Sequence, residues 1–539
     1  MNDPAGDAEE TSAPRTRWIW GWIAVGILMI LAIAPQVRDV LNDRSISNVI
    51  TLAAFSLAGM VLLGMLYRWT AARFSRWNAI VLLLVILVTP LSLVKLRGFS
   101  GEMIPRLEYR FKRTANLQET IAVADESDNK VVANQSFAQF LGADRNAVIK
   151  QREFAVPSGD EEELWRIEIG EGWAGFAIQD QSCVTLEQRG ERECVTCYRL
   201  ADGALLWIQE NQARHQNPMG GVGPRSTPTI VGEFVYTQGA TGIVQCLRLA
   251  SGELVWKQSL LELGGWTQSE SESSVTWGRA TSPLVTQRWC VVPFGRPIEG
   301  EGLSPELAGR SLIAFDTVSG EVGWTAGQDQ ISYASPVTMT LASLPQIVSV
   351  NEATVTGHDL ADGHELWSLE WAGQSNGAPN CASVVPVDRD AFLVAKGYGT
   401  GSGVFELSKV GDDWSIKQRW KSHRVLKTKF THACVDGELA YALSDGTLEC
   451  VSLLDGNRRW SQGRGSRYEH GQMLRVGDCL VVQAEDGRVA FVKATADEFR
   501  ELYTLDALSG KTWNIPAVAG QFLALRNDVE AVMYRLPAK

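Results

Sequence analysis

The sequence predicts an all-β, eight-bladed β-propeller over residues 161–539, preceded by an N-terminal α-helical membrane anchor of three transmembrane helices. Three observations predict this architecture. The first hundred residues contain three long apolar runs, and the rest of the chain repeats a strand–turn–strand unit that ends on tryptophan. The 50 glycines and 19 tryptophans in 539 residues also suit a β-rich repeat protein with many tight turns.

The charge balance narrows the class of partner. The chain has 50 Lys and Arg residues against 62 Asp and Glu residues, which gives a formal net charge of −12. Proteins that bind nucleic acid normally carry a basic surface. The composition therefore predicts that the protein binds no nucleic acid.

The three apolar runs each approach the roughly 20 residues that a helix needs to cross the hydrocarbon core of a bilayer. They predict spans at 18–36, 49–67 and 77–95, after a polar tail of residues 1–17. A cleaved signal peptide does not fit, since no small-residue cleavage site follows the first run and two more spans come next. Three successive runs also disfavour a buried core hairpin.

The positive-inside rule sets the expected orientation. Five arginines flank the side expected in the cytoplasm: Arg15, Arg17, Arg68, Arg73 and Arg76. Five basic residues also flank the opposite side, so the two counts are equal and the rule favours this orientation only weakly: Arg38, Arg44, Lys95, Arg97 and Arg106. With three spans, the residues after Val94 are expected on the periplasmic side of a bacterial inner membrane. Residues 96–160 are largely polar and lack periodicity, which predicts a tether and lead-in.

The repeated unit is most regular around five tryptophans. In each copy a glycine lies four residues before the tryptophan, and Asp or Ser precedes the glycine, as in "VTCYRLADGALLW". Such a pair between alternating apolar runs predicts a β-hairpin, since glycine accepts the positive φ of a tight turn. Upstream, Ser-Pro or Thr-Pro opens another pair of strands in several copies, so each unit supplies four strands. The five copies end at Trp207, Trp256, Trp324, Trp367 and Trp460.

Four strands at intervals of about 40 to 50 residues are typical of propeller blades. Trp420 ends a fifth blade with an altered turn, and the seventh blade, near Phe499–Leu502, lacks the tryptophan. The eighth blade is expected to be split, with three strands from residues 512–536 and the outer strand from "EELWRIEIG", which contains Trp165. This closure leaves no free sheet edge. The repeat tryptophans are expected to pack between blades, against the neighbouring glycine backbone.

At this point the pattern resembles the PQQ-type repeat. The consensus G-x-(I/V/L)-x-(A/C)-x-(D/R)-x-x-(S/D)-G-x-x-x-W lies within residues 136–538, and "FAQFLGADRNAV" is similar to a lead-in of bacterial propellers of this kind, with Ala147 where glycine is usual. The repeat occurs in quinoprotein alcohol dehydrogenases and in the non-enzymatic propeller lipoprotein of outer-membrane protein assembly. The resemblance therefore implies the fold without implying one activity.

The nine cysteines divide into groups. Cys197, Cys246 and Cys450 each lie ten residues before a blade tryptophan, where other blades have Ala314 or Gly357, so this position favours a small buried side chain. The C-x-x-C that ends at Cys197 lies on a strand, where residues three apart face opposite ways, beyond disulfide reach. Disulfides across blades stay open for the others: Cys183, Cys290, Cys381, Cys434 and Cys479.

No motif assigns a catalytic residue or a metal ligand. The six histidines form neither H-x-H nor H-E-x-x-H, and no Walker, G-x-S-x-G or EF-hand pattern occurs. A quinoprotein dehydrogenase needs a calcium ion held by carboxylate and amide oxygens, and an Asp base. The resemblance further implies a disulfide between adjacent cysteines for the alcohol dehydrogenases, but the chain has no Cys-Cys pair. We therefore expect no cofactor, with PQQ and calcium as the alternative.

One set of basic residues suggests an anion site. They precede the inner strand of several blades, where they would make a positive mouth at one end of the central channel. A tricarboxylate such as PQQ or an acidic peptide would suit that mouth, although the same residues would equally serve as structural ion pairs between blades. The four candidates are Arg225, Arg279, Lys429 and Arg467.

The sequence favours a membrane-tethered, extracytoplasmic propeller that acts as an interaction scaffold for protein partners and is not a catalyst. Two alternatives stay open: a PQQ- and calcium-dependent dehydrogenase, and a sensor whose propeller binds a ligand.

Overall fold

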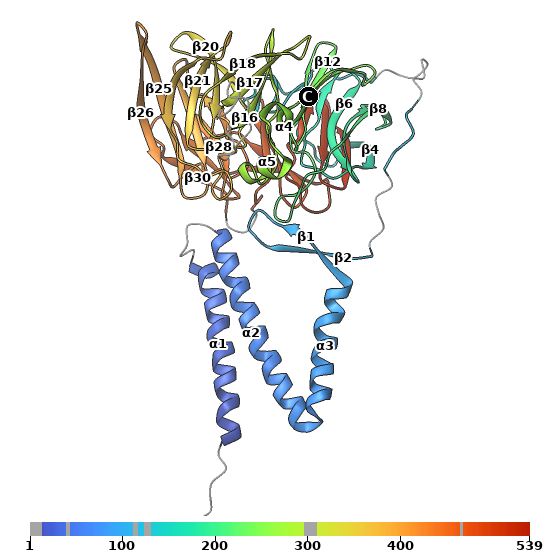
Figure 1. Cartoon of the computed structure of the whole chain (residues 1–539). Helices are drawn as coiled ribbons and strands as arrows, with labels where there is room; N and C mark the ends of the chain where they lie inside the picture. Colours follow the sequence, from blue (N-terminus) through green and yellow to red (C-terminus); the bar gives the residue numbers. More distant parts are fainter. Residues whose placement is uncertain (1–12, 39–43, 112–116, 123–130, 296–309, 464–466) are drawn as a thin grey trace, which may run out of the picture. The chain divides into compact units, whose positions relative to one another are not determined.

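The chain forms two compact units, Met1–Arg113 and Thr114–Lys539. The computed structural model describes residues 13–38, 44–111, 117–122, 131–295, 310–463 and 467–539. The first unit contains three helices and a β-hairpin, and the second is an all-β propeller (Figure 1). Residues 1–12 of the predicted polar tail lie outside the described residues.

The helices of the first unit are α1 (Ala13–Arg38), α2 (Arg44–Arg73) and α3 (Arg76–Leu93). Two of the described stretches, Ile46–Arg73 and Arg76–Leu93, are long and apolar enough to cross a membrane, not the three that the sequence predicts. The apolar stretch described in α1 is shorter, Gly21–Ile33. The first unit is thus an apolar helical unit whose described residues supply two candidate spans.

A short connection makes α2 and α3 neighbours. The Ser75 side chain accepts a hydrogen bond from the backbone N–H of Asn78, which caps the start of α3. Two residues separate the helices, so they run antiparallel and the start of α2 lies at the same end of the pair as the end of α3 (Figure 1). The hairpin of β1 (Val94–Phe99) and β2 (Pro105–Tyr109) follows α3 directly.

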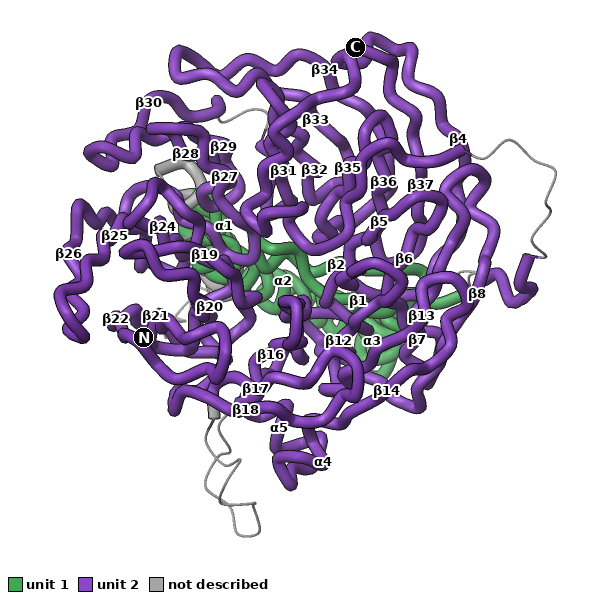
Figure 2. Tube along the Cα trace, turned by 90° about the horizontal axis from the view of Figure 1, so that it is seen from above, with its two compact units in different colours: residues 1–113 green, residues 114–539 purple. Residues whose placement is uncertain are grey.

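The second unit is an eight-bladed propeller, as the sequence predicts. Eight antiparallel sheets of four or five strands are arranged around a central axis (Figure 2). The strands of blades 1 to 4, from inner to outer, are β5 (Ala177–Gln179), β6 (Ser182–Arg189), β7 (Arg192–Arg199), β8 (Leu205–Gln212); β11 (Thr229–Val231), β12 (Phe234–Gln238), β13 (Ile243–Arg248), β14 (Leu254–Ser259); β15 (Leu284–Val285), β16 (Trp289–Gly295), β17 (Arg310–Asp316), β18 (Val322–Ala326); and β19 (Val337–Leu341), β20 (Leu344–Val350), β21 (Thr354–Asp359), β22 (Glu365–Glu370).

Blades 5 to 8 continue the pattern with two variations. The strands are β23 (Val385–Pro386), β24 (Ala391–Lys396), β25 (Gly401–Val410), β26 (Asp413–Ser422); β27 (Cys434–Asp436), β28 (Leu439–Ser444), β29 (Thr447–Ser452), β30 (Arg458–Ser461); β31 (Gln472–Val476), β32 (Cys479–Gln483), β33 (Arg488–Lys493), β34 (Glu501–Asp506); and β35 (Ala517–Ala519), β36 (Phe522–Arg526), β37 (Glu530–Arg535), β4 (Glu162–Glu168). Blade 7 gains a fifth, parallel strand, β3 (Val148–Ile149), beside β31. Between blades 1 and 3 lie β9 (Gln216–Asn217), β10 (Gly221–Val222), α4 (Leu260–Gly264) and α5 (Gln268–Ser274).

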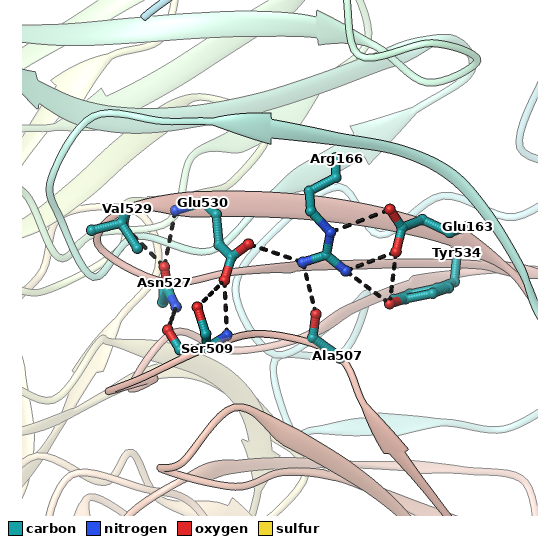
Figure 3. Close-up of polar contacts among 8 residues, drawn as sticks. All are labelled: Glu163, Arg166, Ala507, Ser509, Asn527, Val529, Glu530 and Tyr534. Atoms are coloured by element: carbon teal, nitrogen blue, oxygen red, sulfur yellow. Dashed lines mark hydrogen bonds and ion pairs between the residues drawn. The ribbon is translucent and has the colours of Figure 1, made fainter. Parts of the chain in front are cut away.

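The split eighth blade is confirmed. Strand β4 pairs antiparallel with β37, and Trp165 lies opposite Met533. Arg166 donates to Glu163, to Glu530 and to the carbonyl of Ala507, with N···O distances of 2.7, 2.9 and 2.9 Å (Figure 3). These bonds lower the pKa of Glu163, chiefly through its hydrogen bonds with Arg166. The N-terminal strand is therefore held by its backbone ladder and by a charged side chain.

The repeat tryptophans lie between blades. A Cβ placed on Gly203, at φ +70°, would come within 2.8 Å of the Trp165 ring, so the ring packs directly on the neighbouring glycine backbone. The same contact joins Trp207, Trp256, Trp324 and Trp420 to Gly252, Gly320, Gly363 and Gly456. Most of the indoles also donate to a carbonyl of the next blade: Trp165 to Leu200, Trp207 to Leu249, Trp256 to Thr317, Trp420 to Leu453 and Trp460 to Thr495.

Three blades depart from this rule: the indole N–H of Trp324 in blade 3 has no hydrogen-bond partner among the described residues. Trp367 donates to Gln346 of its own blade and stacks on Phe392 of blade 5. In blade 7 the register places Tyr503 opposite Phe491, where other blades have their tryptophan. The outer strand there spans Glu501–Asp506, so it ends later in the chain than the predicted end near Phe499–Leu502, because this blade lacks the Gly turn that marks the register elsewhere.

A segment before the propeller fills its central channel; we call residues 133–149 the channel loop. Phe137 exchanges backbone hydrogen bonds with Ile178 of blade 1, and the carbonyl of Ala138 accepts from Ile230 of blade 2. Arg145, which is buried, donates to the carbonyls of Ser282 and Pro283 in blade 3, both at 2.9 Å.

The channel loop also reaches the opposite side of the ring. The carbonyl of Ala147 accepts from the backbone of Arg475, and Val148 then joins the inner edge of blade 7. Ala147 has φ +61°, which explains why glycine is usual there in the related lead-in. The loop thus fastens blades on both sides of the channel.

Candidate functional site

The central channel has two different ends. Each blade-to-blade linker runs from an outer strand to the next inner strand, and these linkers share one end, which we call the linker end. The channel loop enters from the opposite end, where Ala133 donates to the carbonyl of Asp180 in the β5–β6 turn. The channel loop thus occupies the opposite end, and the candidate site is built at the linker end.

The Ser/Thr-Pro elements form a row of hydrogen bonds across blades 1 to 5, just inside the linker end. The N–H of Gly175 donates to Thr227 Oγ1 at 3.1 Å, and the N–H of Thr227 donates to Ser282 Oγ at 2.9 Å. The N–H of Ser282 donates to Ser335 Oγ at 2.9 Å, and Ser383 Oγ donates to the carbonyl of Ser335. Each of these residues lies two positions before an inner strand. The recurring hydroxyl therefore links neighbouring blades.

Two histidines occupy the same position in blades 6 and 7. His432 and His470 are buried, and none of their four ring nitrogens has a hydrogen-bond partner among the described residues. Burial is the main cause that lowers the pKa of His432 to about 4, and burial with nearby Lys429 and Arg467 lowers that of His470 further. Both imidazoles are therefore neutral at physiological pH.

An aromatic cluster lies at the linker end between the last blade and the first. Lys511 Nζ is 3.8 Å from the ring centroid of Trp513 and 4.5 Å from that of Trp173. The two indole rings are 5.1 Å apart, and Phe430 packs on Trp513 at 4.8 Å. A cation over two aromatic faces is an arrangement that suits a flat, anionic or polar ligand. Sequence reasoning missed this cluster, although Trp173, Phe430 and Trp513 all lie four residues before an inner strand.

The four predicted anion-binding residues all lie at the linker end, where Arg279, Lys429 and Arg467 are buried and Arg225 is partly buried. Arg225 donates to the carbonyls of Gly220 and Gly223, at 2.9 and 2.6 Å. Arg279 donates to the carbonyls of Pro293 and Phe294 and lies 5.5 Å from the ring of Trp266.

Lys429 and Arg467 are brought together near His470. Lys429 Nζ is 5.7 Å from the ring of Tyr398, and Arg467 donates to Thr447 Oγ1 at 3.1 Å. Burial lowers the pKa of Arg225 and of Arg279 to about 10, so both remain charged at physiological pH. The described contacts fasten all four to loops and rings of the propeller, and an anion-binding role stays a prediction.

The cysteines are free thiols in the structure, so the disulfides across blades that the sequence left open are absent from it. Cys197, Cys246 and Cys450 lie opposite Trp207, Trp256 and Trp460, as expected for small side chains that pack under a large ring. Burial raises the pKa of Cys197 and of Cys450 to about 12. These thiols are therefore packing residues with little thiolate character.

A cavity of about 460 Å³ opens at the linker end beside blade 1. Its lining residues are polar apart from one alanine: Glu191, Gln212, Ala213, Arg214, Gln216, Gln268 and Glu272. The wall formed by α5 is fixed because Glu272 bonds to the buried His215 at 2.9 Å and Gln268 donates to the carbonyl of Arg214. Within the described ranges, the group with metal-ligand geometry lies elsewhere: Asp359, Asp362 and His364, around the turn between β21 and β22.

Comparisons with known proteins agree on the fold. A family profile described as outer membrane protein assembly factor BamB matches residues 117–292 and 191–462. No curated protein matches the chain significantly.

Solved structures share the propeller at low sequence identity. BamB from Moraxella catarrhalis has a TM-score of 0.50 at 12% identity, over 70% of this chain and 100% of its own. Quinohemoprotein alcohol dehydrogenase from Comamonas testosteroni has a TM-score of 0.55 at 11% identity, over 76% and 81%. The quinohemoprotein alcohol dehydrogenase ADHIIG from Pseudomonas putida HK5 has a TM-score of 0.53 at 10% identity, over 75% and 81%. At these identities the likeness concerns the fold alone, whereas the profile covers more than half of the chain; the chain therefore belongs to the family of outer membrane protein assembly factor BamB.

Proposed function

We propose that the chain is a propeller anchored in the bacterial inner membrane, with its propeller on the periplasmic side, and that it serves as an interaction scaffold for protein partners. The channel loop is the observation that carries this proposal. Phe137 bonds to the inner strand of blade 1 and Arg145 to carbonyls of blade 3, so the channel loop occupies part of the channel interior. The blade loops and edges around it suit a macromolecular partner.

Two further observations support the scaffold. The basic groups at the linker end are engaged with backbone carbonyls or ring faces, as Arg225 and Arg279 show. The family to which the chain belongs is described by an assembly factor, and the solved BamB is matched over its whole length. Fold likeness alone assigns no partner, so the partner is defined here only as a protein.

The anchor follows from the first unit. Helices α2 and α3 have the length and apolar composition for spans, and α1 contributes the third span in this proposal. Arginines lie near the start of α1 and on both sides of the α2–α3 connection, and by the positive-inside rule they support a cytoplasmic position for these ends: Arg15, Arg17, Arg68, Arg73 and Arg76. An odd number of spans then carries the propeller to the periplasm.

The aromatic cluster favours one alternative, a PQQ-dependent dehydrogenase. Lys511 over Trp173 and Trp513 suits a planar carboxylate. Among the described residues, the group of His, Cys, Asp and Glu side chains with metal-ligand geometry lies on the exposed turn around Asp362, away from the linker end. This separation of carboxylates and aromatic cluster supports the scaffold over the dehydrogenase.

The experiment compares both functions on the full chain in lipid nanodiscs. We expect no saturable binding of PQQ with calcium by calorimetry, and no reduction of an artificial electron acceptor with alcohols or sugars. The scaffold proposal would be overturned by dye reduction together with stoichiometric PQQ binding. That binding would have to be lost in Lys511→Gln but kept in Lys150→Gln. Lys150 is the matched control because its side chain is 80% exposed, outside the channel.

Topology is tested in cells. Alkaline phosphatase fused after residue 160 is expected to be active, because the enzyme folds only outside the cytoplasm. An inactive fusion there, with an active one between α2 and α3, reverses the orientation and removes the periplasmic location.

A further inference from the structure

The hairpin of β1 and β2 has two chemically different faces. Leu96 lies opposite Leu107, and Val94 lies opposite Tyr109, so these four side chains share one face. Lys95 lies opposite Glu108 on the other face, where Glu108 accepts from Arg97 at 2.7 Å and lies 3.4 Å from Lys95. One face is therefore apolar and the other is charged.

The apolar face is uncovered in the structure. Leu96, Leu107 and Tyr109 are 51%, 65% and 54% exposed. An isolated two-stranded hairpin is marginally stable in water, since it has no second layer against which to bury such a face. This hairpin consequently needs a partner that covers Leu96 and Leu107.

The position of the hairpin identifies that partner. Strand β1 begins at Val94, the residue after α3 ends, and the N–H of Arg110 returns to the carbonyl of Leu93. Helix α3 has 18 residues, which at about 1.5 Å per residue make roughly 27 Å, close to the hydrocarbon thickness of a bilayer. A spanning α3 therefore ends at the boundary between acyl chains and headgroups, and the hairpin starts there.

The turn of the hairpin is fixed at the same level. Asn48, in the first turns of α2, donates to the carbonyl of Glu102 at 2.7 Å. The start of α2 and the end of α3 lie at one end of the helix pair, so the hairpin runs across this end instead of away from it (Figure 1). Its long direction is thus held along the plane of the membrane.

We propose that the β1–β2 hairpin lies in the membrane interface, with Leu96, Leu107 and Tyr109 inserted among the lipids and the charged face toward water. The proposal rests on the membrane anchoring stated under the proposed function. The hairpin carries Lys95, Arg97, Arg106 and Arg110 against Glu102 and Glu108, so it attracts anionic phospholipid headgroups. Tyr109 suits the headgroup level, where amphipathic rings collect.

The test places an environment-sensitive fluorescent amino acid at one site at a time in the full chain, in nanodiscs that contain brominated lipids. The three sites are Leu107 on the apolar face, Lys95 on the charged face and Leu84 within α3. We expect strong quenching at Leu107 and Leu84 and at least a threefold weaker effect at Lys95. In nanodiscs with anionic lipid, Arg106→Gln should reduce quenching at Leu107, whereas in purely zwitterionic nanodiscs it should not.

The outcomes separate this inference from the anchor itself. Quenching at Leu84 without quenching at Leu107 overturns the interfacial hairpin and leaves the spans intact. Blue-shifted emission at Leu107 without lipid quenching means that protein covers the face, which also overturns it. Absence of quenching at Leu84 overturns the membrane anchor and the hairpin proposal together.

Discussion

Truncation of Trp165 to alanine tests how the propeller closes. The ring is buried, packs on the backbone of Gly203 and donates from its indole to the carbonyl of Leu200 at 2.8 Å. Removal of a buried tryptophan costs about 3–5 kcal/mol. With an unfolding entropy of about 2.1 cal/mol/K per residue over roughly 400 residues, this loss lowers Tm by about 4–6 °C if the propeller unfolds cooperatively.

The assay is thermal unfolding of the full chain in detergent, followed by near-UV circular dichroism. Glu162→Ala on the same strand is the matched control, because its exposed pair with Arg535 contributes about 0–1 kcal/mol. Gly203→Ala should also destabilise, since its Cβ would meet the Trp165 ring. In the Trp165→Ala background that clash disappears. The double variant should therefore lose less stability than the sum of the losses in the two single variants. Equal Tm values for Trp165→Ala and Glu162→Ala, or strict additivity with Gly203→Ala, would refute the closure described here.

Three further predictions concern buried polar groups. Arg145→Ala should destabilise the propeller by about 2–4 kcal/mol, because Arg145 bonds to buried carbonyls of blade 3. The control Lys150→Ala lacks such bonds and should cost less than about 0.5 kcal/mol. Equal free energies of unfolding for the two variants would contradict the role of the channel loop. Burial raises the pKa of Glu193 to about 7, above its usual 4.5, so the free energy of unfolding should fall as pH rises from about 4.5 to about 7. Glu193→Gln should remove this pH dependence and should have a higher Tm than the wild type at about pH 8. Maleimide should label at most the partly exposed Cys381 in the native protein and nine thiols after unfolding, as counted by intact mass; a pair that stays unlabelled without reductant would indicate a disulfide.

Local repeats made the blades predictable. The Gly–Trp spacing determines both the hairpin turn and the register, since Gly252 has the expected positive φ and Cys246 lies opposite Trp256. The split blade was predictable for the same reason, because Trp165 marks an outer strand that lacks its three partners nearby. Where the marker is missing, as in blade 7, the predicted position of the outer strand was early by a few residues.

Long-range contacts were not predictable from these patterns. Residues 133–149 are polar in part and show no hydrophobic periodicity. Phe137 and Arg145 are nevertheless buried, because the channel loop forms hydrogen bonds with backbone groups of several inner strands. The recurrence of Arg225 and Arg279 before inner strands suggested a ligand, but a charge pattern does not reveal that nearby carbonyls already accept their hydrogen bonds. The aromatic cluster around Lys511 joins the last blade to the first, a proximity that no local spacing encodes.

The split eighth blade has a consequence for biosynthesis. Strand β4 is made before the first seven blades, and β37 is made after them, with Glu162 and Arg535 separated by 373 positions. Until β37 has been made the nascent propeller is therefore an open ring, and strand β4 has no partner strand. Loop closure over so long a segment is slow, and unpaired edges of this kind aggregate. The yield of folded propeller is thus set by how long β4 stays unpaired, which is the time that translation needs to supply β37.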